Sequence, residues 1–152
     1  MKKILFMLLV LSQAAFAQVS VNRYEAEMLK NPNKGGKDTR EVNAVMIFEK
    51  DALKITSRRS KETFKEFKYS DINYIEHSFS KSPQLSATTR SLIWGALFPE
   101  LLLIPRKEKH WVTILTEEDF VVLKIENDNY RLLKMEFLVR DLDLIELNED
   151  RQ

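Results

Sequence analysis

Residues 44–57, AVMIFEKDALKITS, decide the fold class of this chain. The first five residues are a β-prone run, and the polar stretch from Glu49 to Ala52 then turns the chain. From Leu53 to Ser57 apolar and polar residues alternate, which is the pattern of a strand with one buried face. The stretch therefore predicts a β-hairpin, and the chain is expected to be built on antiparallel strands.

The rest of the chain repeats this pattern outward from the hairpin. Turn residues separate further apolar or alternating runs, and these predict strands at 63–69, 72–79, 110–116 and 120–125, with a short last strand at 144–147. We expect a mainly β domain of the α+β class, an antiparallel open barrel or pair of bent sheets capped by a C-terminal helix. Such a barrel, with the helix across its open end, would leave no free sheet edges.

The capping helix is expected at 130–140. Asn127-Asp128-Asn129 offers an N-cap just before it. Apolar residues that recur at helical spacing predict its inward stripe: Leu132, Met135, Val139 and Leu142, with Leu138 beside them. Leu133 and Phe137 widen this stripe. Leu133, Met135, Phe137 and Val139 also alternate as a strand would, but length and the cap favour the helix.

The N-terminus is typical of a cleavable secretory signal. Met1-Lys2-Lys3 is basic, Ile4 to Leu11 is apolar, and residues 12–17 are small and more polar. The apolar run is too short for a membrane-spanning helix. We expect cleavage after Ala17 and export to a bacterial periplasm or the outside of the cell. Residues 18–42 are interpreted as a partly ordered lead-in, residues 43–147 as the folded domain and 148–152 as a polar tail.

Composition excludes several classes of function. The chain has no cysteine and two histidines, so thiolate catalysis and cysteine-ligated metals are excluded, and the domain depends on its core rather than on disulfides. Loss of Lys2 and Lys3 with the signal lowers the formal net charge from +1 to −1. A near-neutral domain does not favour nucleic acid as a partner.

Residues 91–105, SLIWGALFPELLLIP, form an unusual apolar insertion. Pro99 would break a helix through it, so two short apolar arms are expected. The arms could pack on the core or a subunit interface, insert shallowly into a membrane face, or fill a groove on a partner protein. The candidate contact residues are Leu92, Ile93, Trp94, Leu97, Phe98, Leu101, Leu102, Leu103 and Ile104.

No residue pattern predicts catalysis or a metal site. His77 and His110 lack the partners that a general base needs, and each is interpreted as a structural or surface histidine. The acids of Glu117-Glu118-Asp119 are interpreted as a solvated turn. Arg58, Arg59 and Lys61 form a compact basic turn, which is either a solvated hairpin tip or a contact for an anionic group.

Four short motifs resemble the bacterial pleckstrin-homology-like domains, over roughly residues 43–147. They are Phe48-x-x-x-x-Leu53-x-Ile55, Phe67-x-Tyr69-Ser70-Asp71-Ile72-x-x-Ile75, Lys109-His110-Trp111-Val112-Thr113-Ile114 and Asn129-Tyr130-Arg131-Leu132-Leu133. The resemblance implies two antiparallel sheets, a capping helix, and a binding or scaffolding role rather than catalysis. The turn Glu49 to Ala52 lacks the basic cluster of phosphoinositide binders, so that ligand is not implied. Leu142-Asp143-Leu144 stands where relatives often carry glycine.

These observations together predict an exported, non-enzymatic binding or scaffold domain without a cofactor. The prediction allows the domain to form an oligomer. Its partner would be a protein or a membrane surface that contacts residues 91–105. The alternative is an exported carrier that holds a lipid or small apolar ligand inside the barrel.

Overall fold

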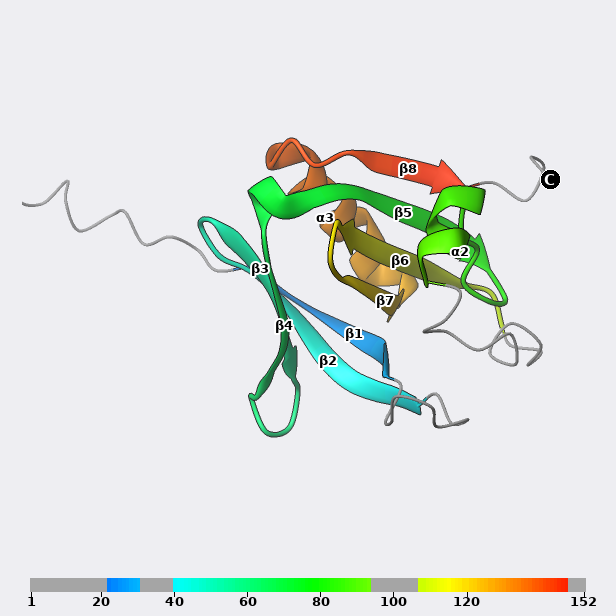
Figure 1. Cartoon of the computed structure of the whole chain (residues 1–152). Coiled ribbons are helices and arrows are strands. Elements are labelled where there is room, and N and C mark those ends of the chain that lie inside the picture. Colours follow the sequence, from blue (N-terminus) through cyan, green and yellow to red (C-terminus); the bar gives the residue numbers. More distant parts are fainter. Residues whose placement is uncertain (1–21, 31–39, 94–106, 148–152) are drawn as a thin grey trace, which may run out of the picture.

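The computed structural model describes residues 22–30, 40–93 and 107–147 (Figure 1). Residues 1–17, which were predicted to be a signal sequence, and most of the apolar insertion lie outside these ranges. In chain order the elements are β1 (Asn22–Lys30), β2 (Arg40–Phe48), β3 (Ala52–Ser57), β4 (Thr63–Lys68), the 3-10 turn η1 (Tyr69–Asp71), β5 (Ile72–Ser80), α2 (Ala87–Ile93), β6 (Lys109–Thr116), β7 (Phe120–Ile125), α3 (Asn127–Val139) and β8 (Leu144–Leu147). The expected strands are confirmed, with ends that differ by a few residues.

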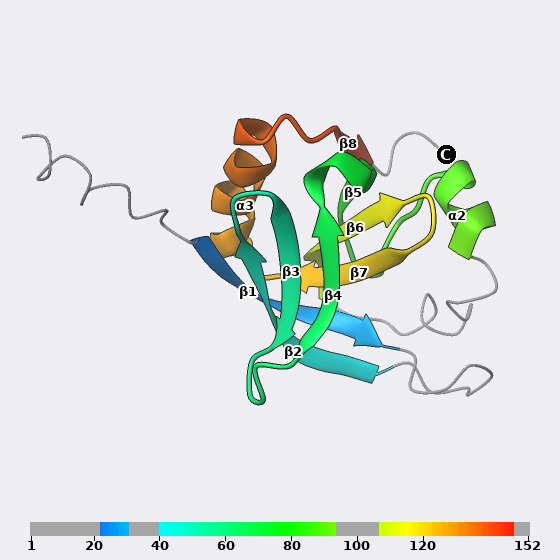
Figure 2. The same cartoon turned by 60° about the vertical axis from the view of Figure 1, so that its left-hand side comes forward.

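The strands form one open, strongly bent sheet in the order β4-β3-β2-β1-β7-β6-β5-β8. Every neighbouring pair is antiparallel except β5 and β8, which run parallel. The prediction of a mainly β, mostly antiparallel domain with a C-terminal helix is therefore confirmed, but the expected absence of free sheet edges is wrong. Within the described residues β4 and β8 are the two edge strands, because they stand at the ends of this order and β4 pairs only with β3 (Figure 2).

The first strand was missed by the sequence analysis. Residues 22–30 were expected in a partly ordered lead-in, but they form β1, which pairs with β2 along its whole length. β1 also pairs with β7 through Ala26, Glu27 and Met28. The folded sheet thus begins at residue 22 rather than 43. Arg23, Glu25 and Glu27 alternate with Tyr24, Ala26 and Met28 as in a strand, but so short a run also fits a helical turn.

The core lies on the concave face of the sheet. Its largest fully buried side chains include Phe48, Met46, Leu53, Ile55 and Phe137. Helix α3 covers this face with Tyr130, Leu133 and Phe137. The predicted inward stripe is therefore wrong in its main members, because Leu132, Met135, Leu138 and Val139 are 53–76% exposed. Leu133 and Phe137, which were predicted to widen it, and Leu142, beyond the helix, are buried.

The two ends of helix α3 are capped by backbone contacts. It starts three residues before the predicted position, and Glu126, which makes no side-chain capping bond, is its N-cap. At the other end Asp141 takes a left-handed conformation (φ 56°), and the Leu142 N–H donates to the Phe137 carbonyl at 3.0 Å. Asp141 thus occupies the position that favours glycine after a helix.

Helix α2 was not predicted, and it packs against β5. A buried polar layer holds it there, because the Thr89 Oγ1–H donates to Glu76 at 2.6 Å and the Ser86 N–H donates to the same carboxylate at 3.3 Å. Glu76 and Thr89 are both essentially inaccessible to solvent. Among the described helices, none has the length and apolar character to cross a membrane.

Candidate functional site

Two histidines meet beside the edge strand β8. Nε2 of His77 on β5 lies 2.9 Å from Nδ1 of His110 on β6. Nδ1 of His77 contacts a carboxylate oxygen of Glu146, which is its register partner on β8. The other carboxylate oxygen accepts hydrogen bonds from Tyr130 at 2.9 Å and Lys134 at 2.6 Å. Three strands and one helix therefore contribute to one polar cluster.

The rings of this cluster are stacked. Tyr130 lies over His77 with a centroid distance of 3.9 Å and an interplanar angle of 15°, and over His110 at 4.2 Å and 12°. Phe79 packs against the free side of His110 at 4.8 Å. Tyr130 thus shields one face of both imidazoles, and His77 is buried while His110 remains half-buried.

Burial controls the charge of the cluster. It lowers the pKa of His77, although Glu146 partly offsets the effect. Burial and the neighbouring His77 lower the pKa of His110. Burial alone would raise the pKa of Glu146, but hydrogen bonds from Lys134, His77 and Tyr130 lower it to about 2. At neutral pH the cluster is a carboxylate with two neutral imidazoles.

The hydrogen bonds define the tautomers. Glu146 can only accept, so His77 donates from Nδ1 and accepts at Nε2 from the Nδ1–H of His110. The acceptor left at the end of this chain is Nε2 of His110, where a proton could bind. Within the described ranges no group of three or more His, Asp or Glu residues is arranged to hold a metal ion.

Sequence reasoning missed this cluster. His77 and His110 were each considered alone, Tyr130 was predicted only as the start of a helix, and Glu146 only as part of the short last strand. The register of a parallel pair between β5 and a four-residue strand has no local sequence signal. The available signal was the alternation of His77, Ser78 and Phe79 in a predicted strand. It places His77 and Phe79 on the same face of the strand.

The outer face of α3 is a second candidate surface. Four large apolar side chains project from it into solvent: Leu132, Met135, Leu138 and Val139. The opposite face of the same helix is packed on the core through Leu133 and Phe137. A row of exposed apolar side chains on a firmly held helix is typical of a docking surface.

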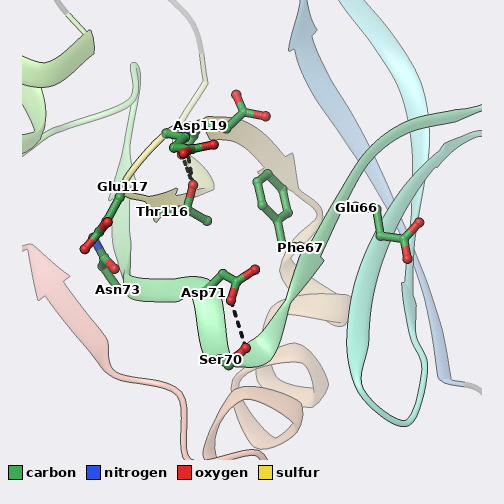
Figure 3. A pocket seen from close by; sticks show the side chains of 9 residues that line it. Glu66, Phe67, Ser70, Asp71, Asn73, Thr116, Glu117 and Asp119 are labelled. Atoms are coloured by element: carbon green, nitrogen blue, oxygen red, sulfur yellow. Dashed lines mark hydrogen bonds between the residues drawn. The ribbon is translucent and has the colours of Figure 1, made fainter.

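A groove beside the edge strand β4 is a third candidate. One cavity of about 530 Å³ lies between the β4–η1 corner and the β6–β7 turn (Figure 3). Its lining is strongly acidic and contains no Lys, Arg or His: Glu66, Phe67, Ser70, Asp71, Asn73, Thr116, Glu117, Glu118 and Asp119. The acids predicted as a solvated turn thus form one wall of a cavity.

The basic turn predicted for anion contact lies between β3 and β4. Arg58, Arg59 and Lys61 are all exposed, and Arg58 forms an ion pair with Glu25 at 2.9 Å. Lys61 adopts a left-handed backbone (φ 62°), which closes the hairpin. The three cations do not line any of the cavities described here.

The predicted apolar contact segment is described only at its start. Leu92 is 66% exposed on α2, and Ile93 ends that helix. The other candidate residues lie outside the described ranges: Trp94, Leu97, Phe98, Leu101, Leu102, Leu103 and Ile104.

No protein-family model matches this chain, and no curated protein sequence matches it. Among solved structures it is similar to the hSac2 domain from the human phosphoinositide phosphatase Sac2, with a TM-score of 0.47 and 10% identity over 99% of this chain and 92% of that one. It is also similar to the C-terminal domain of an unknown protein from Leishmania infantum, with a TM-score of 0.41 and 12% identity over 91% and 99%.

The first of these similarities corrects one expectation. The sequence analysis assigned the chain to the non-enzymatic class, whereas the hSac2 domain comes from a phosphatase. We therefore withdraw that assignment. No catalytic residue is transferred from that phosphatase to this chain.

Proposed function

We propose that the protein is an exported pleckstrin-homology-like binding domain that pairs with a second copy of itself through the outer face of α3. The observation that carries the proposal is the exposure of Leu132, Met135, Leu138 and Val139 on one helix. The order of four strands, three strands and a helix supports the pleckstrin-homology-like part of the proposal.

The spacing of the stripe suits a two-fold axis. Leu132 and Leu138 each lie three residues from Met135. An antiparallel pair centred on Met135 would place Leu132 of one copy against Leu138 of the other, and the two Met135 side chains against each other. Such a self-complementary patch is what an isologous dimer requires.

Charge around the stripe also favours a protein partner. Exposed Asp128 and Arg131 lie at its N-terminal end and exposed Asp141 at its C-terminal end. An antiparallel pair brings the Arg131 end of one helix towards the Asp141 end of the other, and the two helix dipoles oppose. An anionic lipid surface would instead select a clear excess of Lys and Arg around the stripe.

The interface would be small. A pair of helices of 13 residues buries less than the roughly 800 Å² per partner that a stable complex needs. We therefore expect a weak dimer that depends on concentration and that permits exchange with other amphipathic helices.

Sedimentation equilibrium of the mature chain, residues 18–152, tests the proposal. The wild-type chain should shift from monomer to dimer with concentration. Leu132→Glu with Met135→Glu should remain monomeric while its circular dichroism and unfolding curve stay close to wild type, because both side chains point to solvent. Leu92→Glu, the same change at an exposed leucine of α2, is the matched control and should still dimerise.

Three results would overturn the proposal. They are a wild-type chain that stays monomeric at all concentrations, a dimer that survives the double substitution, and a dimer lost in Leu92→Glu alone. Binding to vesicles of phosphatidylglycerol that is lost in the double variant, without any dimer, would make the face a membrane contact instead.

We do not extend the proposal to the carrier alternative. The concave side of the sheet is filled by Phe48, Met46 and Phe137, which are fully buried. An apolar guest of lipid size would have to displace these side chains from the core.

A further inference from the structure

Two cavities lie in line along the edge strand β4. The acidic cavity of about 530 Å³ is lined by Glu66 and Phe67 from β4 and by residues 116–119 of the β6–β7 turn. A second cavity of about 340 Å³ is lined by residues 62–65 around the start of β4, by residues 28–30 of β1 and by residues 119–122. Asp119 belongs to both walls, so the two cavities form one groove.

One ion pair divides the groove. Lys65 Nζ lies 2.6 Å and 2.5 Å from the two carboxylate oxygens of Asp119. Both side chains are more than a third exposed, at 35% and 44%. Screening makes such a pair weak, and a competing cation can replace Lys65 at little cost.

The two halves differ in chemistry. The 530 Å³ half presents Asp71, Glu117 and Glu118 besides Asp119, without a cation among its lining residues. Glu66 also lines it, but its carboxylate lies 3.9 Å from Lys54 and points away from the other acids (Figure 3). In the described ranges Glu117 and Glu118 form no ion pair. The 340 Å³ half is more apolar, with Met28, Leu29, Phe64, Phe120, Val121 and Val122 in its wall. Its wall also holds Glu62, Thr63, Lys65, Asp119 and Lys30, whose ammonium lies 5.0 Å from the centre of the Phe64 ring.

The edge of β4 supplies the backbone contacts. Within the described part of the sheet, β4 pairs only with β3, so its other side offers unpaired N–H and C=O groups along the groove. An extended segment can add to such an edge by backbone hydrogen bonds, while alternate side chains enter pockets. The Phe67 side chain, buried and facing the acidic half, gives that pocket an apolar floor.

We propose that this groove binds an extended segment of a partner protein in which basic residues precede apolar residues. The segment would lie antiparallel to β4, so that its N-terminal Lys or Arg enters the acidic half and displaces Lys65 from Asp119. Its later apolar side chains would contact Phe64 and Leu29. This proposal uses a different surface from α3 and stands independently of self-association.

A labelled peptide tests the proposal directly. The probe is fluorescein-Lys-Thr-Arg-Thr-Val-Thr-Phe-Thr-amide, in which Lys, Arg, Val and Phe share one face of a strand. Fluorescence anisotropy should show saturable binding to the mature chain. The same peptide with Glu at both basic positions, and a peptide of reversed order, should bind at least tenfold more weakly.

Variants of the chain test the residues. Glu117→Gln with Glu118→Gln should weaken binding about tenfold and reduce its dependence on salt. Asp51→Asn with Asp143→Asn changes the net charge equally at exposed sites outside the groove and should leave binding unchanged. Lys65→Ala should strengthen binding severalfold, because Asp119 becomes available to the peptide.

Phe64→Ala should weaken binding while the salt dependence stays as in the wild type. The proposal is overturned if the wild-type chain does not bind the probe saturably, if the Glu-substituted peptide binds equally well, or if Glu117→Gln with Glu118→Gln has no larger effect than the Asp51 and Asp143 control. A loss of binding in Lys65→Ala would equally contradict displacement of Lys65.

Discussion

His77 and His110 stand 33 residues apart in the chain, yet their facing ring nitrogens lie 2.9 Å apart beneath the ring of Tyr130. Glu146 accepts from the far side of His77, and Lys134 and Tyr130 hold the same carboxylate. Protonation of His77 at Nε2 would place a cation in the buried stack and break the donor–acceptor order, whereas a proton on Nε2 of His110 keeps that order but still adds a charge beside the stack.

The stability of the protein should therefore fall as pH drops below about 6.5, the ordinary pKa of histidine. The pKa values of His77 and His110 are lowered by burial, so the unfolded chain binds more protons than the folded chain in this range. We expect a loss of about 1 kcal/mol in the free energy of unfolding between pH 7.5 and 5.5. Urea unfolding at the two pH values measures it.

Glu146 acts in a different window. Its pKa of about 2 in the fold lies below the ordinary value, so its contribution to the free energy of unfolding is complete above pH 4.5 and is lost only as pH falls from there towards 2.

His77→Gln with His110→Gln should flatten the change in the free energy of unfolding between pH 7.5 and 5.5, whereas Glu126→Gln, which alters an exposed acid outside the cluster, should not. An unaltered slope in the histidine variant would refute the explanation.

The two faces of α3 should respond very differently to truncation. Phe137→Ala removes a fully buried ring from the core and should cost about 3–5 kcal/mol. Met135→Ala truncates a side chain that is 55% exposed and should change stability by less than about 0.5 kcal/mol. Chemical unfolding at low protein concentration gives both values. Equal costs would mean that the helix packs through its other face.

Asp141→Gly should stabilise the protein by about 1 kcal/mol, because a left-handed backbone is costly for residues that carry a Cβ. The melting temperature should rise by about 3 °C. Asp143→Gly is the matched control, since Asp143 has no positive φ. If both changes lower the melting temperature alike, the strain at Asp141 is absent.

Thr89→Val should loosen α2. The substitution keeps the shape but removes the hydroxyl that donates to the buried Glu76 carboxylate, a loss of about 1–3 kcal/mol. Hydrogen exchange of the α2 amides should become faster, while exchange in β6 and β7 stays close to wild type. Thr88→Val, one residue away and exposed, should have little effect. The account of α2 anchoring fails if the two variants behave alike.

The sequence predicted strands well where one face is buried. The alternation from Leu53 to Ser57 is the pattern of a strand packed on one side, and β3 lies where it was expected. β1 was missed although Arg23, Glu25 and Glu27 alternate with Tyr24 and the buried Ala26 and Met28, because so short a run also fits a helical turn and no local pattern shows that the strand is paired on both sides. Pairing depends on partners far away in the chain, which local patterns do not report.

The helix shows a different limit. The spacing of apolar residues predicted the helix itself. It did not predict which face is buried, since α3 carries two apolar faces. Tyr130, Leu133 and Phe137 were the buried face, and the longer aliphatic stripe was left in solvent. The larger aromatic side chains fill the concave sheet better, and this depends on the shape of the cavity beneath them. The same choice created the exposed face that we propose as the docking surface.

The seam between β1 and β7 sets the order in which this chain can fold. Only three register pairs join the two halves of the sheet, Ala26, Glu27 and Met28 with Ile125, Lys124 and Leu123. These contacts link segments nearly 100 residues apart, and contacts of such long range form slowly. A growing chain can therefore assemble β1 to β4 as a meander, but β1 keeps one unpaired edge until residues 123–125 have been made. Before that point β1 exposes a row of unpaired backbone N–H and C=O groups, at which another unfinished chain can pair and aggregate.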